Sequence, residues 1–384
     1  MLVLSVLAAA LFAAPTPESP TLLLLPNGAP EEPKFWKQVA DSVQWHYTEA
    51  ANVAPGNPAD PAVKELEKLV DELRKERKGP IYLVGAGPNA AVAFYAGMRA
   101  PHLFTAVLAV GGTPKPAIDS DRVFAANAGL LPIAWAVTPE DKAANSTLFQ
   151  KLSVGRIEIE LLESANTAQA VQWLAKQKHT EWPQKVDCET GNPTLARCYW
   201  FTPTEFDPKL SNAALRTTRI SADSLASLDF GGFGYRADAP GPGVVVEFLP
   251  PNYSGPLKVK DRIVALSGAA IADPRHYVEK MSQVTEEKPV AVTIERDKER
   301  IRLVTRYVLR QRPEVITARV KAEYVPDIKE ITIVSRTVAT ARLQVPPQWA
   351  PVSVNWNGTT VAQPTEPGCW IVSIKNPGEA RPCQ

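Results

Sequence analysis

Residues 81–112 constrain the possible folds of this chain more than any other stretch. Residues 81–84 form a short apolar run, residues 85–89 contain two glycines and a proline, and residues 90–100 are mostly small and apolar. Another apolar run occupies residues 106–110. Short apolar runs separated by a glycine turn and a small-residue helix indicate two buried strands, joined by a helix that packs closely on their sheet.

The same alternation extends to both sides of this stretch. The pattern predicts further strands at residues 21–25, 131–137 and 156–162, which makes five strands with the two central ones. Helices are expected through Phe35, Trp36, Val39, Val43 and Tyr47, at residues 62–78, from Glu140 onward, and at residues 168–178. Helices between buried strands imply a parallel sheet with right-handed crossovers. The fold class expected for residues 20–182 is therefore α/β.

The size and charge of the chain exclude one class of function. Lysine plus arginine (42) nearly balances aspartate plus glutamate (41) over 384 residues, and 45% of the residues are hydrophobic. A chain of this length can form two or three domains with substantial cores. Because it has no excess of positive charge, a nucleic-acid partner is not expected.

The first residues have the form of an export signal. Residues 1–14 are almost wholly apolar, and a polar, proline-rich segment follows them at residues 15–20. The apolar run is too short to span a bilayer but has the length of a signal-peptide core. We therefore predict a signal peptide and linker at residues 1–19, export to the periplasm or the extracellular space, and no integral membrane segment. A buried first strand or a mis-assigned start codon is the alternative.

Four cysteines form two pairs that are close in sequence. Cys188 and Cys198 flank a Gly-Asn-Pro turn, and Cys369 and Cys383 flank an Asn-Pro-Gly turn. Each pair can close a short loop, and two local disulfides suit an oxidising compartment. The alternative is a metal site, but neither pair has close metal-ligand spacing and the chain has only four histidines. Two disulfides, no metal and no cofactor are predicted.

The strand, glycine turn and helix around Gly87 resemble the nucleophile elbow, G-x-S-x-G, of the α/β-hydrolase family. The resemblance implies a serine at the centre of the turn, an acid after residue 137 and a histidine after residue 162. The chain has Gly87 at the first position, Glu140 or Asp141 at the second, and at the third a loop that ends at Asn166 without a histidine. Gly87, Asp141 and Asn166 are thus degenerate positions, and no catalytic residue is predicted.

The same glycine turn also resembles a G-x-G-x-x-G/A phosphate loop, which would imply dinucleotide binding. Pro88 removes one backbone donor from that loop, and no acidic residue ends a suitable next strand.

Residues 183–224 are expected to form a disulfide-closed β-hairpin and a connector. Its strands would be residues 182–186 and 198–201, and residues 212–220 would add another strand. Hairpins of this kind follow the core in secreted esterases of the polyhydroxybutyrate-depolymerase and dienelactone-hydrolase type, which this part of the chain resembles.

Residues 225–312 combine a glycine–aromatic loop with strand-like runs at 243–249, 256–268 and 290–296 and a helix-forming stretch at 274–284. Their order and spacing resemble a PDZ domain, although Lys260 and Ser267 depart from the family's pattern. The resemblance places Gly232, Phe233, Gly234 and Tyr235 in a carboxylate-binding loop, and His276, Tyr277 and Met281 on the opposite wall of a groove. It implies an α+β domain that binds protein or peptide C-termini by strand addition. The alternatives are a plain tight turn and ordinary packing of the helix.

Residues 313–384 predict a small, antiparallel, all-β domain. Short β-branched runs at 330–334, 341–345, 352–356 and 370–374 are separated by turn residues, and Cys369 and Cys383 would fix the last strand. Trp349, Trp356 and Trp370 either pack in its core or stack on sugars.

Together these features predict an exported, non-catalytic protein that acts in peptide binding, protein binding or scaffolding. Its parts would be an α/β-hydrolase-like domain, a PDZ-like domain and a small β domain. An active secreted serine hydrolase, esterase or peptidase-associated protein that uses non-standard residues is the main alternative. A carbohydrate- or envelope-associated structural protein is the third.

Overall fold

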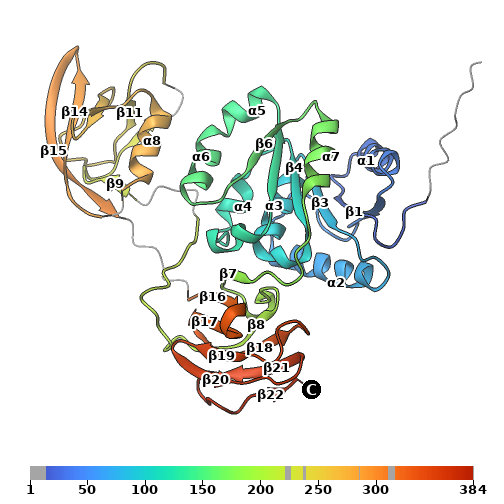
Figure 1. The fold of residues 1–384 in the computed structure, drawn as a ribbon. Helices are drawn as coiled ribbons and strands as arrows, with labels where there is room; N and C mark the ends of the chain where they lie inside the picture. Colours follow the sequence, from blue (N-terminus) through green and yellow to red (C-terminus); the bar gives the residue numbers. More distant parts are fainter. Residues whose placement is uncertain (1–13, 221–225, 237–238, 285, 310–315, 384) are drawn as a thin grey trace, which may run out of the picture. The chain divides into compact units, whose positions relative to one another are not determined.

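The computed structural model describes residues 14–220, 226–236, 239–284, 286–309 and 316–383, so the predicted signal segment up to residue 13 lies outside the described residues. The chain forms two compact units (Figure 1). The first unit holds the residues up to 145, 152–220 and 316–384, and the second holds residues 146–151 and 221–315. Most of the second unit is thus an insertion in the chain of the first.

A six-stranded parallel sheet forms the centre of the first unit, in the order β2-β1-β3-β4-β5-β6. Its strands are β1 (Thr21–Leu25), β2 (His46–Glu49), β3 (Ile81–Ala86), β4 (Ala106–Val110), β5 (Ile133–Val137) and β6 (Glu160–Glu163). The four leucines of β1 are fully buried. A strand can be apolar on both sides only where both faces of its sheet are covered.

Helices cover both faces of this sheet. They are α1 (Glu31–Ser42), α2 (Asp60–Glu76), α3 (Asn89–Arg99), α4 (Lys115–Asp119), α5 (Pro139–Ala144), α6 (Ser146–Val154) and α7 (Thr167–Lys176), with the 3₁₀ turns η1 (Pro101–Leu103) and η2 (Ala125–Leu130). Trp36 of α1 and Trp173 of α7 pack in one cluster with Leu108 of β4. The neighbouring residue Val107 points to the other face, where a Cβ at Gly97 of α3 would lie 2.7 Å from its side chain. This is the α/β architecture that the sequence predicts.

Two details of the α/β part differ from the prediction. The prediction of a single helix that continues through Val43 to Tyr47 is wrong, because α1 ends at Ser42. The residues of β2 instead form a sixth strand at the edge of the sheet, paired with β1. The chain turns between them at Gln44, whose φ is 58°. The last strand, expected from residue 156, begins only at Glu160.

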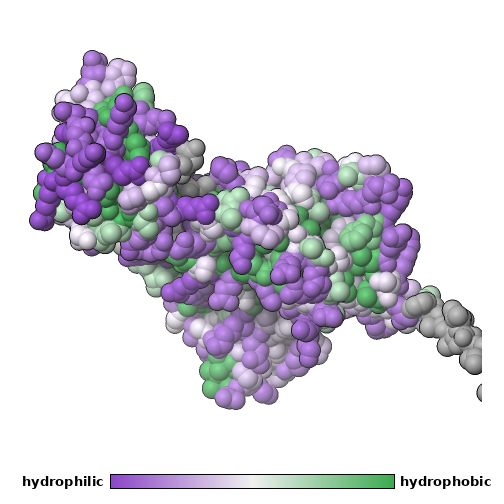
Figure 2. Space-filling view, turned by 90° about the horizontal axis from the view of Figure 1, so that it is seen from above, coloured by the Kyte–Doolittle hydropathy of each residue, from purple (hydrophilic) through white to green (hydrophobic). Residues whose placement is uncertain are grey.

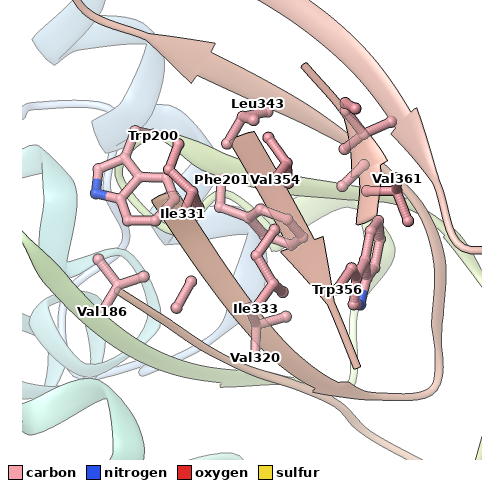
Figure 3. Packing of buried hydrophobic residues seen from close by; sticks show 14 of the residues in the cluster. Val186, Trp200, Phe201, Val320, Ile331, Ile333, Leu343, Val354, Trp356 and Val361 are labelled. Carbon is pink, nitrogen blue, oxygen red and sulfur yellow. The ribbon is translucent and has the colours of Figure 1, made fainter. Parts of the chain in front are cut away.

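The remaining strands of the first unit form two facing sheets. Their orders are β20-β19-β17-β16-β7 and β22-β21-β18-β8. The strands are β7 (Lys185–Thr190), β8 (Phe201–Phe206), β16 (Ala318–Val325), β17 (Glu330–Arg336), β18 (Val338–Val345), β19 (Ser353–Trp356), β20 (Thr359–Ala362), β21 (Gly368–Ser373) and β22 (Arg381–Pro382), with the 3₁₀ turns η3 (Pro193–Leu195) and η4 (Pro326–Ile328). One apolar cluster between the sheets joins Phe201 and Leu343 to Ile333 and Trp356 (Figure 3).

This β-sandwich corrects several expectations. The hairpin is wrong, because β7 pairs with β16 in one sheet and β8 with β18 in the other. Residues 212–220 form no strand, and only an isolated bridge joins Arg219 to Phe124. The sheets are not wholly antiparallel, since β19 runs parallel to β17. Trp349 and Trp356 are core residues rather than sugar-stacking ones, being 4% and 0% exposed.

Within its inserted segment, the described residues of the second unit form one sheet and one helix. Its strands are β9 (Ala226–Leu228), β10 (Gly234–Arg236), β11 (Val244–Phe248), β12 (Arg262–Leu266), β13 (Ala269–Ala270), β14 (Pro289–Arg296) and β15 (Glu299–Leu309), and its helix is α8 (Pro274–Ser282). The main path of the sheet is β10-β11-β12-β14-β15-β9, with β13 paired to β12. Tyr277 and Met281 of α8 pack in the core with Val246 and Ile263 of the sheet.

Much of the visible surface of both units is hydrophilic, with apolar residues in scattered patches (Figure 2). No helix in the described part of the chain is both long enough and apolar enough to cross a bilayer.

Candidate functional site

The turn at Gly87 lies at the carboxyl edge of the parallel sheet, between β3 and α3. Gly87 has φ of 56°, its N–H donates to the carbonyl of Val110 (2.8 Å), and its own carbonyl accepts from Ala90 (3.2 Å). A Cβ at Gly112, on the loop after β4, would lie 2.3 Å from the Gly87 carbonyl oxygen. The two loops therefore touch through their backbones, and position 112 requires glycine.

The amide side chain of Asn89 connects this turn to the loop after β1. The buried side chain of Asn89 donates to the carbonyls of Leu25 (3.1 Å) and Pro26 (2.8 Å), which holds the loop after β1 against the turn. A Cβ at Gly87 would have only Asn27 Nδ2 near it, at 3.8 Å. The backbone at this position thus has a left-handed conformation with room for a side chain, but Gly87 supplies none.

The other two degenerate positions lie at the starts of helices. Thr138 Oγ1 accepts a hydrogen bond from the Asp141 N–H in the first turn of α5 (3.0 Å). The side-chain oxygen of Asn166 accepts from the N–H of Gln169 at the start of α7 (3.0 Å). Both residues follow carboxyl ends of strands, on the same edge as Gly87. Asn166 has no ionisable group with which to replace a histidine.

The histidines lie elsewhere. His46 is the first residue of β2, His102 lies in η1 just before β4, and His179 lines the same cavity as His102. These three are at the amino edge of the parallel sheet, opposite Gly87. His276 belongs to the second unit. None of the first unit's histidines therefore lies at the carboxyl edge, where it could act as a general base beside Gly87.

In the second unit, the loop before β10 brings the predicted carboxylate-binding residues together. Gly231 and Gly232 have φ of 78° and 85°. Within the described chain, the N–H groups of Gly232 and Phe233 make no hydrogen bond. Among the described strands, β10 pairs with β11 alone and stands at one end of the strand order. The amides of this loop thus continue directly into the terminal strand of the described sheet.

Three α8 residues were predicted to form the other wall, and the structure separates their roles. The ring of Tyr277 meets the ring of Tyr235 on β10 edge to face, with centroids 5.3 Å apart. Tyr277 and Met281 are 5% and 2% exposed, so both belong mainly to the core. The Nδ1 atom of His276 accepts a hydrogen bond from the Ala272 N–H (3.1 Å), which ties this ring to the start of the helix.

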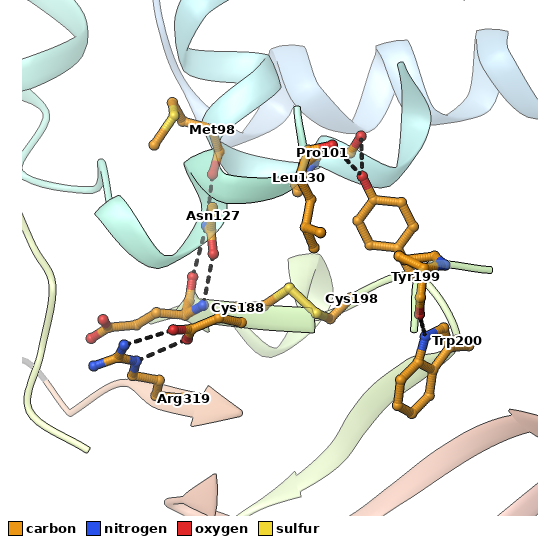
Figure 4. Close-up of a disulfide and its surroundings, with 12 residues drawn as sticks. Met98, Pro101, Asn127, Leu130, Cys188, Cys198, Tyr199, Trp200 and Arg319 are labelled. Atoms are coloured by element: carbon orange, nitrogen blue, oxygen red, sulfur yellow. Dashed lines mark hydrogen bonds and ion pairs between the residues drawn. A yellow bond between two sulfur atoms is a disulfide. The ribbon is translucent and has the colours of Figure 1, made fainter. Parts of the chain in front are cut away.

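Both predicted disulfides are present, joining Cys188 to Cys198 and Cys369 to Cys383. The first bond closes the loop between β7 and β8, beside contacts that join the sandwich to the α/β part (Figure 4). There, Asn127 Nδ2 donates to the carbonyl of Glu189 in β7 (3.0 Å), and the Glu189 N–H donates to Asn127 Oδ1 (2.7 Å). No group of three or more potential metal-binding side chains occurs within the described ranges.

A buried ionic cluster centred on Asp60 has no counterpart in the sequence analysis. Tyr95 Oη (2.6 Å) and Arg99 Nε (3.0 Å) donate to Asp60 Oδ1, while Arg122 Nη1 (3.1 Å) and Asn192 Nδ2 (2.7 Å) donate to Oδ2. Burial favours the neutral acid, but these hydrogen bonds and the Arg99 charge outweigh it and lower the pKa of Asp60 to about 2. The members of this cluster are far apart in the sequence, so no local sequence pattern predicts it.

Comparison with known proteins gives little further information. No protein-family model matches the chain, and no curated protein matches it. A solved structure, a crystal structure of a thermostable esterase, has a TM-score of 0.31 at 17% identity and covers 42% of this chain. The matched part spans 55% of that esterase. At this TM-score the likeness carries no argument, and the α/β architecture stands on the strand order alone.

Proposed function

We propose that this chain is an exported, non-catalytic protein whose second unit is PDZ-like and binds the C-terminal carboxylate of a peptide or protein. The carrying observation is the continuity between the amides of Gly232 and Phe233, which make no hydrogen bond in the described chain, and β10, the terminal strand in the described strand order of its sheet. A peptide that adds to β10 as a further strand brings its terminal carboxylate to these amides. Two disulfides are compatible with an oxidising compartment.

The first unit supports the non-catalytic part of the proposal. Its parallel sheet and the left-handed turn at Gly87 are compatible with an α/β-hydrolase-like domain. The turn has no hydroxyl or thiol, and His46, His102 and His179 lie at the opposite edge of the sheet. Acyl transfer by the usual route needs a nucleophile and a base within hydrogen-bond reach of each other.

Peptide recognition is tested by an array of peptides with free C-terminal carboxylates, each paired with its amidated form. Binding of the best peptide to the full chain is then measured by fluorescence anisotropy. Charge-assisted hydrogen bonds to the carboxylate predict that amidation weakens binding about tenfold or more.

A pair of glycine variants locates the site. Gly232→Leu and Gly268→Leu impose similar backbone strain, since the two glycines have φ of 85° and 81°. Gly268 lies in the β12–β13 turn, with nothing within 4 Å of a Cβ placed there. Gly232→Leu should abolish binding while Gly268→Leu keeps it. Equal affinity for amidated peptides, or equal loss in both variants, contradicts carboxylate capture by this loop.

A further inference from the structure

A large cavity lies in the first unit, at the amino edge of the parallel sheet and so away from Gly87. Its volume is about 920 Å³, and its walls come from α2, η1, η3 and the outer face of the β8–β18–β21 sheet. The proposed peptide groove belongs to the other unit, so this cavity is independent of it. Several of its polar atoms have no hydrogen-bond partner among the residues that the structure describes.

Arg74, near the end of α2, presents an unused donor in this wall. Its Nη1 atom donates to the carbonyls of Gly79 (2.5 Å) and Lys78 (3.3 Å), which fixes the guanidinium plane. Its Nη2 atom is buried and has no hydrogen-bond partner among the described residues. Burial lowers the pKa of this guanidinium, with the charge of Glu181 opposing the shift. Burying a cationic donor without an acceptor costs folding free energy, so we expect a ligand or an ordered water to accept this hydrogen bond.

Two more arginines line the same cavity from separate segments. Arg197 follows η3, and Arg342 lies on the outer face of β18, between the core residues Ala341 and Leu343. Neither guanidinium makes a hydrogen bond or an ion pair within the described ranges. Three guanidinium groups with spare donors therefore surround one space, and the fork of each matches an oxyanion.

A neutral imidazole completes this wall. Both ring nitrogens of His102 are buried without a partner in the described chain. Burial, together with the charge of Arg197, lowers the pKa of His102 to about 3, so the ring is neutral near pH 7 and offers one donor and one acceptor. The nearby Tyr199 hydroxyl is already used, because it donates to the carbonyl of Leu130 (3.1 Å).

The charges that line the cavity favour an anion. Three carboxylates are present, on Glu67, Asp71 and Glu181. They face the four cations of Arg74, Lys78, Arg197 and Arg342; the fifth cationic residue, Arg99, is paired with Asp60. We infer that this cavity binds a small organic anion bearing carboxylate or phosphate groups, held by Arg74, Arg197 and Arg342.

Isothermal titration of the full chain with citrate, inorganic phosphate and neutral glucose tests this inference. Citrate presents planar carboxylates and phosphate a tetrahedral oxyanion, so the two probes distinguish the sources of the charge. Saturable heat with either anion and none with glucose is expected. Titrations at constant ionic strength remove general screening effects.

Variants assign the binding to this cavity. Arg342→Gln and Arg197→Gln each remove a guanidinium that makes no hydrogen bond or ion pair with another described residue, so folding should be kept while anion affinity falls about tenfold or more. The matched control is Arg381→Gln, which makes the same charge change on β22 of the same sheet, outside the cavity. Absence of anion binding overturns the inference. So does an affinity unchanged by Arg342→Gln and Arg197→Gln, or reduced equally by Arg381→Gln. None of these results bears on peptide binding by the second unit.

Discussion

At the scale of single residues, Gly87 combines a left-handed turn with the absence of a side chain. Its φ of 56° is a backbone conformation that residues other than glycine adopt only with strain. The neighbouring Gly112 must remain glycine because the backbone of Gly87 lies too close for a Cβ there. The space around a Cβ at position 87 is nevertheless open. Introducing a hydroxyl at position 87 is therefore sterically possible, but no histidine of the first unit lies beside it to act as a base.

We expect Gly87→Ser to fold but to gain no hydrolase activity. The left-handed conformation should cost about 1–2 kcal/mol of unfolding free energy, and the new hydroxyl has no imidazole to activate it. Urea unfolding and labelling with a fluorophosphonate probe measure the two effects. Gly28→Ser is the matched control, since Gly28 also has positive φ (89°) and open space, on the loop after β1. Stoichiometric labelling of Gly87→Ser alone would falsify the non-catalytic proposal.

Asp60 illustrates the opposite case, a residue whose role is to hold charge inside the first unit. Its side chain is 7% exposed and pairs with Arg99, which is 1% exposed. Replacing one member of a buried pair leaves the other uncompensated. The cluster spans α2, α3 and the loop after β7, so its loss affects contacts between the α/β part and the sandwich.

Asp60→Asn should lower the unfolding free energy by about 3–5 kcal/mol at neutral pH, because Arg99 would be left buried without its anion. The folded-state pKa of Asp60, about 2, lies below its ordinary 3.8. Its stabilisation is therefore present above pH 3.8 and is lost as pH falls toward 2. Urea midpoints between these pH values should decline less in the variant than in the wild type. Asp119→Asn, which breaks the exposed pair with Lys115, should change stability by under about 1 kcal/mol. Similar losses in both variants would contradict the role given to Asp60.

At the scale of secondary-structure elements, sequence patterns predicted what is local. β1, β3, β4 and β5 are continuous apolar runs because both their faces are covered, and the turn at Gly87 follows from its glycines. β2 was not predicted because it is a short, partly buried edge strand, and such a strand has few apolar residues by which to recognise it. Helical spacing of Val43 and Tyr47 then imitated a longer α1.

Pairing between distant strands was beyond sequence analysis. β7 and β8 are close in the chain and joined by a disulfide, which favoured a hairpin, yet each pairs with a strand more than 100 residues away in a different sheet. Alternating apolar residues show which face of a strand is buried but not which strand lies beside it. The glycine loop of the second unit is a contiguous stretch of sequence, so its position was predictable. The cavity of Arg74, Arg197 and Arg342 was not, because these residues come from segments far apart in the chain.

At the scale of the whole molecule, most of the second unit is inserted in the chain between strands of the sandwich. One buried carboxylate accepts hydrogen bonds from residues on both sides of the insertion. Glu189 Oε2 accepts from the Thr218 hydroxyl (2.8 Å) and backbone N–H (2.7 Å), before the insertion. Its Oε1 accepts from the Thr317 hydroxyl, after the insertion. Arg319 Nη1 also donates to the carbonyl of Arg216 (2.5 Å). The two chain ends are therefore adjacent within the first unit itself.

Replacing residues 221–315 with a short Gly-Ser linker should then leave the first unit folded, because its two ends already meet at Glu189 and closing a short loop costs little. We expect one cooperative urea transition, retained disulfides and unchanged citrate or phosphate binding, with peptide binding lost. The same excision combined with Glu189→Ala is the comparison: it removes the shared acceptor of Thr218 and Thr317 and leaves Arg336 without its buried anion, so stability should fall by about 3 kcal/mol or more. If the excised protein aggregates, or unfolds as readily as the double variant, the first unit depends on the insertion and Glu189 does not close the gap.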